Sequence, residues 1–164
     1  MTQTQAYAPS VTRMRRMHMS TDRKTAVVEI LLVEDSPADA DLMSDALKEG
    51  CLNPRIRVVD NGEDAIHFLH RQGEFVSAPE PDLVLLDLFL PRKNGYEVLA
   101  DIKQDALLRR IPIVILTSAD SEETIRAAYD LHANCCVTKP ADQEQYAQAV
   151  KKIEKFWLRV SRRK

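Results

Sequence analysis

A run of four apolar residues, 83–86, leads directly into the carboxylate of Asp87. The run does not alternate between apolar and polar positions, so it predicts a strand buried on both faces, as in a parallel sheet covered by helices. Pro91 cannot continue a sheet ladder, and the Lys-Asn-Gly sequence at 93–95 predicts a turn into a helix. We therefore expect Asp87 at the carboxyl end of a central strand, the edge where open α/β sheets place their ligands.

The chain from Thr25 onwards alternates strand and helix patterns. Short segments rich in apolar residues predict five strands, at residues 27–33, 55–59, 83–86, 112–116 and 135–138, and the second of them also carries two arginines. Helical periodicity and capping residues predict helices after them, beginning at Ser36-Pro37, near Glu63, near Tyr96, at Asp120 and at Asp142. Five such units, joined by right-handed crossovers, predict an α/β fold with a doubly wound, five-stranded parallel sheet.

Charge and composition restrict the possible functions. The 164 residues carry a formal net charge of −2, but residues 1–24 alone carry +4, which leaves −6 on the rest. An acidic body argues against nucleic acid as a partner, and no apolar run approaches the roughly 18 residues of a membrane span. We expect a flexible basic extension at 1–25, a folded domain at 26–160 and a basic tail at 161–164. Three cysteines without metal-ligand spacing suit a reducing cytosol, so we expect a cytoplasmic protein.

Polar residues follow four of the five predicted strands, and all of them fall on one edge of the sheet. They are Glu34-Asp35, Asp87, Thr117 and Lys139. Three carboxylates within about 5 Å repel by roughly 3 kcal/mol per pair at an effective dielectric near 20, so they need a cation among them. Oxygen ligands without His or Cys favour Mg²⁺. A carboxylate nucleophile, a metal, an ammonium group and a hydroxyl together suit phosphoryl transfer to an aspartate.

The ordered set of motifs along the chain resembles the receiver domains of two-component response regulators. The motifs are Glu34-Asp35, Asp87 with Leu90-Pro91 and Gly95, Thr117-Ser118, and Lys139-Pro140. The resemblance covers residues 27–159 and implies a flavodoxin-like (βα)5 sheet in the strand order 2-1-3-4-5. It also implies that Asp87 accepts a phosphoryl group from a sensor histidine kinase.

The same resemblance implies a role for each residue at this edge. Mg²⁺ would bind the side chains of Asp35 and Asp87, the backbone carbonyl of Phe89 and, through water, Glu34. Thr117 would contact the phosphoryl group and Lys139 would bridge it, aimed by a cis peptide bond before Pro140. One position departs from the family pattern, because Cys136 stands where receivers usually carry Tyr or Phe. This departure puts the usual coupling between that ring and Thr117 in doubt.

Two further segments, at 130–135 and 153–158, resemble the single-domain regulators that pair with bacterial and cyanobacterial phytochrome kinases. The resemblance names a phytochrome as a candidate kinase and implies signalling through protein–protein contacts. Because the chain ends at Lys164, we expect no DNA-binding output domain.

Two other classes of function are open. A receiver fold can serve as an interaction scaffold that binds partners without phosphorylation. An aspartyl-phosphate hydrolase is the more distant alternative, because Phe89 stands where such enzymes carry a second aspartate. We therefore expect no enzyme, beyond Mg²⁺-dependent self-phosphorylation and dephosphorylation.

The last predicted helix carries an apolar seam in which Tyr146, Val150, Ile153 and Trp157 recur at heptad spacing, and Phe156 widens this seam. An exposed Phe-Trp pair near the end of a helix is an aggregation liability unless something covers it. We therefore predict a homodimer held by this helix. The alternative is that Trp157 folds back and closes the core of its own domain.

Overall fold

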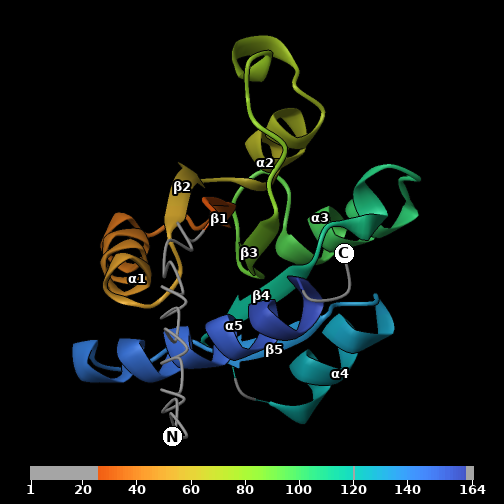
Figure 1. The fold of residues 1–164 in the computed structure, drawn as a ribbon. Coiled ribbons are helices and arrows are strands. Elements are labelled where there is room, and N and C mark those ends of the chain that lie inside the picture. The colour runs from red at the N-terminus through yellow and green to blue at the C-terminus, as the bar shows by residue number, and fades with distance from the viewer. Residues whose placement is uncertain (1–25, 120, 162–164) are drawn as a thin grey trace, which may run out of the picture.

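The computed structural model describes residues 26–119 and 121–161, in which strands and helices alternate along the chain (Figure 1). The strands are β1 (Val28–Val33), β2 (Pro54–Val59), β3 (Leu83–Asp87), β4 (Ile113–Thr117) and β5 (Cys135–Thr138). The α-helices are α1 (Pro37–Glu49), α2 (Gly62–Leu69), α3 (Gly95–Gln104), α4 (Glu122–Asp130) and α5 (Tyr146–Ser161). Short 3₁₀ turns lie at Gly73–Phe75, Leu108–Arg110 and Gln143–Gln145. Among the described helices, none combines the length and the apolar character that crossing a bilayer requires.

The sheet has the order β2-β1-β3-β4-β5, and each neighbouring pair is parallel. This is the predicted doubly wound topology. The register pairs Asp87 with Leu116 and Thr117 with Thr138. The carboxyl ends of β3, β4 and β5 therefore lie side by side, and the first residues after each strand share one edge of the sheet.

Helices cover both faces of the sheet, and each face has its own core. Ile30 and Leu32 of β1 pack in a cluster with α1 and α5, whereas Leu31 and Val33 pack with α2, α3 and α4. Figure 1 shows α1 and α5 on one side of the strands and α2 and α3 on the other. All five residues of β3 are buried, as the absence of polar alternation predicted.

Two helix starts differ from the prediction. Helix α4 is capped by Ser121, whose Oγ accepts a hydrogen bond from the Thr124 N–H at 3.2 Å; the predicted cap, Asp120, lies outside the described residues. Helix α5 begins at Tyr146 because residues 143–145 form a 3₁₀ turn, in which Asp142 accepts a hydrogen bond from the Gln145 N–H. The predicted extension at 1–25 and most of the tail at 161–164 also lie outside the described residues.

The apolar seam of α5 faces the core of its own domain. Its five members are buried, and the most exposed of them, Trp157, keeps only 8% of its surface. The predicted exposure of Phe156 and Trp157 is therefore wrong for the single chain. The spacing of apolar residues does not distinguish the two cases, because one apolar stripe on a helix can pack on a sheet as well as on a second helix. A dimer interface through α5 stays a prediction.

Candidate functional site

Asp87 ends β3 in a tightly packed loop. Its side chain accepts a hydrogen bond at Oδ1 from the Phe89 N–H at 3.1 Å, and the residue keeps 4% of its surface. The Gly95 N–H, at the start of α3, donates to the Leu88 carbonyl at 2.9 Å. A Cβ atom on Gly95 would collide with the backbone carbonyl of Asp87. The Lys-Asn-Gly turn thus brings the start of α3 against the end of β3 and holds Asp87 at the sheet edge.

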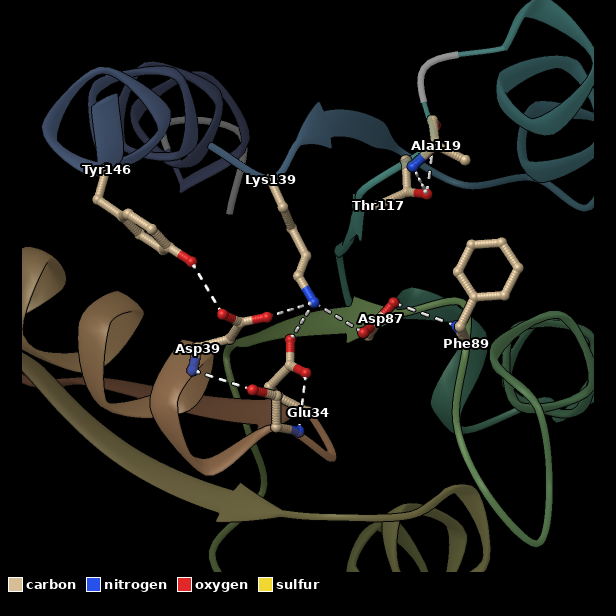
Figure 2. A network of polar contacts seen from close by, with 9 residues as sticks. Glu34, Asp39, Asp87, Phe89, Thr117, Ala119, Lys139 and Tyr146 are labelled. Carbon is tan, nitrogen blue, oxygen red and sulfur yellow. Dashed lines mark hydrogen bonds and ion pairs between the residues drawn. The ribbon is translucent and has the colours of Figure 1, made fainter. Parts of the chain in front are cut away.

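Lys139 follows β5, and its ammonium group lies among three carboxylates (Figure 2). Its Nζ atom is 2.7 Å from Glu34 Oε2, 2.9 Å from Asp87 Oδ2 and 3.1 Å from Asp39 Oδ2. The backbone N–H of Lys139 donates to the Thr117 carbonyl at 2.7 Å, which joins the end of β5 to β4. Burial alone would lower the pKa of Lys139, but its bonds to Glu34 and Asp87 outweigh burial and raise that pKa. Lys139 is therefore charged at neutral pH.

Glu34, Asp35 and Asp87 form a cluster of oxygen ligands. One carboxylate oxygen from each lies within 4.8 Å of the others. Glu34 is buried, and burial raises its pKa, although the ion pair with Lys139 opposes that shift; its second oxygen accepts the Ser36 N–H at 3.1 Å. Asp35 is exposed. Hard divalent cations accept such an oxygen-only set, and a single ammonium group cannot balance three carboxylates, so the residues fit a divalent metal.

Asp39 and Tyr146 also belong to this site, although the sequence pattern assigns no role to Asp39 and predicts Tyr146 in a dimer interface. Asp39 lies in the first turn of α1, where its N–H donates to the capping Oγ of Ser36 at 3.3 Å. Its Oδ1 atom accepts a hydrogen bond from the Tyr146 hydroxyl at 3.5 Å, while its Oδ2 contacts Lys139. The place of Asp39 in the chain could have indicated its role. It lies in the first turn of a helix that starts at the sheet edge, and side chains of that turn lie near the same edge.

Thr117 lies at the same edge, but its hydroxyl points toward the backbone of Ala119. Its Oγ1 atom accepts the Ala119 N–H at 3.1 Å and lies 3.3 Å from the Ala119 carbonyl (Figure 2). Cys136, at the position expected for an aromatic ring, is half-buried; burial raises the pKa of its thiol, and Tyr129 of α4 is its hydrogen-bond partner.

The expected cis bond between Lys139 and Pro140 is wrong, because the described residues contain no cis peptide bond. Lys139 is instead aimed by its three carboxylate contacts and by the hydrogen bond from its backbone to Thr117.

The edge of the sheet thus combines a carboxylate, a fixed ammonium group and an acidic set suited to a divalent cation. The carboxylate of Asp87 is a nucleophile, and the cations offset the negative charge of a phosphoryl group that approaches it. The arrangement therefore suits transfer of a phosphoryl group to Asp87.

Comparisons with known proteins agree with this chemistry. The sequence pattern of the response regulator receiver domain matches residues 30–151. The response regulator Rcp1 of Synechocystis sp. is 46% identical over 129 residues, which cover 79% of this chain and 88% of that protein. The crystal structure of the phosphorylated cyanobacterial phytochrome response regulator RcpA matches with a TM-score of 0.76 at 47% identity, covering 81% of this chain and 95% of that one. The Mn²⁺-bound form of Rcp1 matches with a TM-score of 0.74 at 45% identity, covering 80% and 94%.

Proposed function

Because this chain belongs to the family of response regulator receiver domains, we propose that Asp87 accepts the phosphoryl group of a sensor histidine kinase and thereby switches the protein. The observation that carries the proposal is the ion pair of Asp87 with Lys139 at 2.9 Å, beside two further carboxylates that would hold a divalent cation. The carboxylate of Asp87 is buried and held by these contacts, so its oxygens have a fixed position from which to attack phosphorus.

Each residue of the site has a part in the transfer. A carboxylate oxygen of Asp87 forms the new bond to phosphorus, the bond from phosphorus to the kinase histidine breaks, and the histidine ring leaves with that electron pair. Lys139 offsets negative charge on the phosphoryl oxygens. The Thr117 hydroxyl would contact those oxygens after leaving Ala119, to which it is now bound.

We assign the cation to Mg²⁺. Asp35 and Asp87 would bind it directly, with the Phe89 carbonyl as a third protein ligand and Glu34 acting through water. When bound, it would neutralise charge on the phosphoryl oxygens. The Mn²⁺-bound form of Rcp1 and the oxygen-only donors of this chain support a small divalent ion.

The kinase partner is proposed to be a phytochrome, since RcpA is a cyanobacterial phytochrome response regulator and is 47% identical to this chain. Phosphorylation would then be read by protein partners. The fold alone would also serve a scaffold that needs no phosphate, and the experiment below separates the two.

The test is incubation with acetyl phosphate and Mg²⁺, followed by intact mass measurement. The wild type should gain one phosphate that hydroxylamine removes, and Asp87→Asn should gain none while keeping its circular dichroism spectrum. Asp41→Asn is a matched control, because Asp41 is exposed on α1 and forms no polar contact among the described residues. A wild type that takes no phosphate would favour the scaffold, and full labelling of Asp87→Asn would move the acceptor elsewhere.

We also propose that the protein is a homodimer that pairs through α5. The seam residues are buried, so the contact would be made at the rim of the seam by Leu158, which keeps 46% of its surface. Light scattering should give twice the monomer mass for the wild type and the monomer mass for Leu158→Glu. A wild type of monomer mass would exclude the dimer.

A further inference from the structure

Lys139 has no free hydrogen-bond donor in the unphosphorylated protein. An ammonium group carries three N–H donors, and Glu34, Asp39 and Asp87 supply three carboxylates at 2.7, 3.1 and 2.9 Å. A phosphoryl group on Asp87 extends beyond the carboxylate oxygen that Lys139 now contacts. Lys139 must therefore move to follow the phosphoryl oxygens, and it cannot keep all of its present contacts when it does.

Asp39 is the partner that Lys139 can release most easily. Its contact is the longest of the three, and its side chain is 37% exposed, against 2% for that of Glu34. Water can solvate the carboxylate of Asp39 after release, whereas Glu34 would become a buried charge without its cation. Phosphorylation should thus separate Lys139 from Asp39 and leave its contact with Glu34 in place.

Asp39 also connects the site to α5. While one of its oxygens contacts Lys139, the other accepts the hydroxyl of Tyr146 at 3.5 Å. Figure 2 shows Asp39 between these two side chains. Tyr146 is the first residue of α5 and is buried in the same core as Trp157, so a change at its hydroxyl acts on the packing of that helix.

We propose that Asp39 is a positioning residue for Lys139, and that the contacts from Lys139 through Asp39 to Tyr146 transmit phosphorylation of Asp87 to α5. The inference rests on the proposed function, because it starts from a phosphoryl group on Asp87. When Lys139 turns to that group, Asp39 loses its cation, turns toward water and changes the hydrogen bond that holds the first turn of α5. This route uses neither the hydroxyl of Thr117 nor an aromatic ring at Cys136.

Trp157 provides the measurement, because it is the only tryptophan of the chain and lies buried in α5. Each variant is treated with acetyl phosphate and Mg²⁺, its bound phosphate is measured by intact mass, and its fluorescence is recorded. The wild type should take one phosphate and change its fluorescence. Tyr146→Phe keeps the ring and removes the hydroxyl, and Asp39→Asn keeps the shape and removes the charge. Both should take the phosphate and lose most of the fluorescence change.

Two matched controls should respond as the wild type does. Asp41→Asn removes an equal charge from the same helix, and Tyr129→Phe removes a hydroxyl from α4. A full fluorescence change in phosphorylated Tyr146→Phe or Asp39→Asn would overturn the proposal, and so would a phosphorylated wild type without any change. Failure of Tyr146→Phe to take phosphate would overturn it as well, because the residue would then act in the transfer. Absence of phosphate on the wild type would instead refute the proposed function.

Discussion

Glu154 of α5 accepts hydrogen bonds from two backbone N–H groups just beyond the end of α1. Its Oε1 atom lies 2.5 Å from the Cys51 nitrogen and 3.3 Å from the Leu52 nitrogen. Glu154 is buried, and its carboxylate satisfies both of these N–H groups. The last helix thereby fixes the turn that leads from the first helix into β2.

Glu154→Ala should lower the free energy of unfolding by about 1–3 kcal/mol, because it leaves two backbone donors without their acceptor. Urea unfolding followed by circular dichroism measures the change. Glu144→Ala is the control, since Glu144 is exposed just before α5 and should stay within about 0.5 kcal/mol of the wild type. An unchanged urea midpoint for Glu154→Ala would show that water replaces the carboxylate.

Gly50→Ala should be destabilising in the wild type and much less so in the Glu154→Ala background. A Cβ atom at position 50 would collide with Oε1 of Glu154 and force the carboxylate away from its two donors. The double-mutant cycle isolates this interaction. Equal effects in the two backgrounds would contradict it.

Asp35→Asn should weaken Mg²⁺ binding, because it removes the exposed carboxylate of the acidic cluster. Without metal, the variant should be more stable than the wild type by up to about 1 kcal/mol, since one repulsive charge is gone and solvent screens the rest. Calorimetric titration with Mg²⁺ and thermal unfolding in EDTA measure the two effects. Asp41→Asn should keep the wild-type affinity, and an unchanged affinity in Asp35→Asn would remove Asp35 from the site.

Glu34→Gln tests whether burial or the ion pair with Lys139 has the larger effect on the pKa of Glu34. Burial raises the pKa of Glu34 above its ordinary value of 4.5, so the folded state holds that proton more tightly than the unfolded state. The resulting stabilisation is complete below pH 4.5 and is lost as the pH rises through the raised pKa. Unfolding in EDTA should therefore show the variant gaining stability relative to the wild type as the pH rises above 4.5. A relative loss over that range would mean that the ion pair dominates.

Phe156→Ala should cost about 3–5 kcal/mol, because it opens a cavity in the core shared by α1 and α5. Leu107 is the control, because it keeps 82% of its surface and lies outside α5, so it should tolerate alanine within about 0.5 kcal/mol. Urea unfolding at two protein concentrations separates core packing from association. A small loss for Phe156→Ala that depends on concentration would place the ring in an interface between chains.

Most of the fold can be predicted from the sequence, because the pattern of five strand–helix units is compatible with few arrangements of a sheet. The apolar run before Asp87 fits a strand buried on both faces, and five such units leave little choice of topology. The α5 seam was ambiguous, because heptad spacing and the stripe of a sheet-covering helix nearly coincide over four turns. Whether this seam packs on its own sheet or on a second chain depends on the size of the core beneath it. The local sequence pattern carries no information about that size.

The site likewise has one part that the sequence pattern predicts and another part that depends on packing. Glu34, Asp35, Asp87 and Lys139 follow strands whose ends must meet, so their proximity could be derived. The contacts of Asp39 depend on the angle at which α1 leaves the sheet. The rotamer of Thr117 is decided by the nearby Ala119 backbone. Neither property is set by residue type or spacing.

The depth of Asp87 has a consequence for the duration of the signal. With 4% of its surface open, Asp87 presents only a small part of itself to solvent at the sheet edge. A kinase phosphohistidine or a small phosphodonor must reach the carboxylate at this exposed part. Water must reach the same part to hydrolyse the acyl phosphate, so a partner that covers this edge would prolong the phosphorylated state.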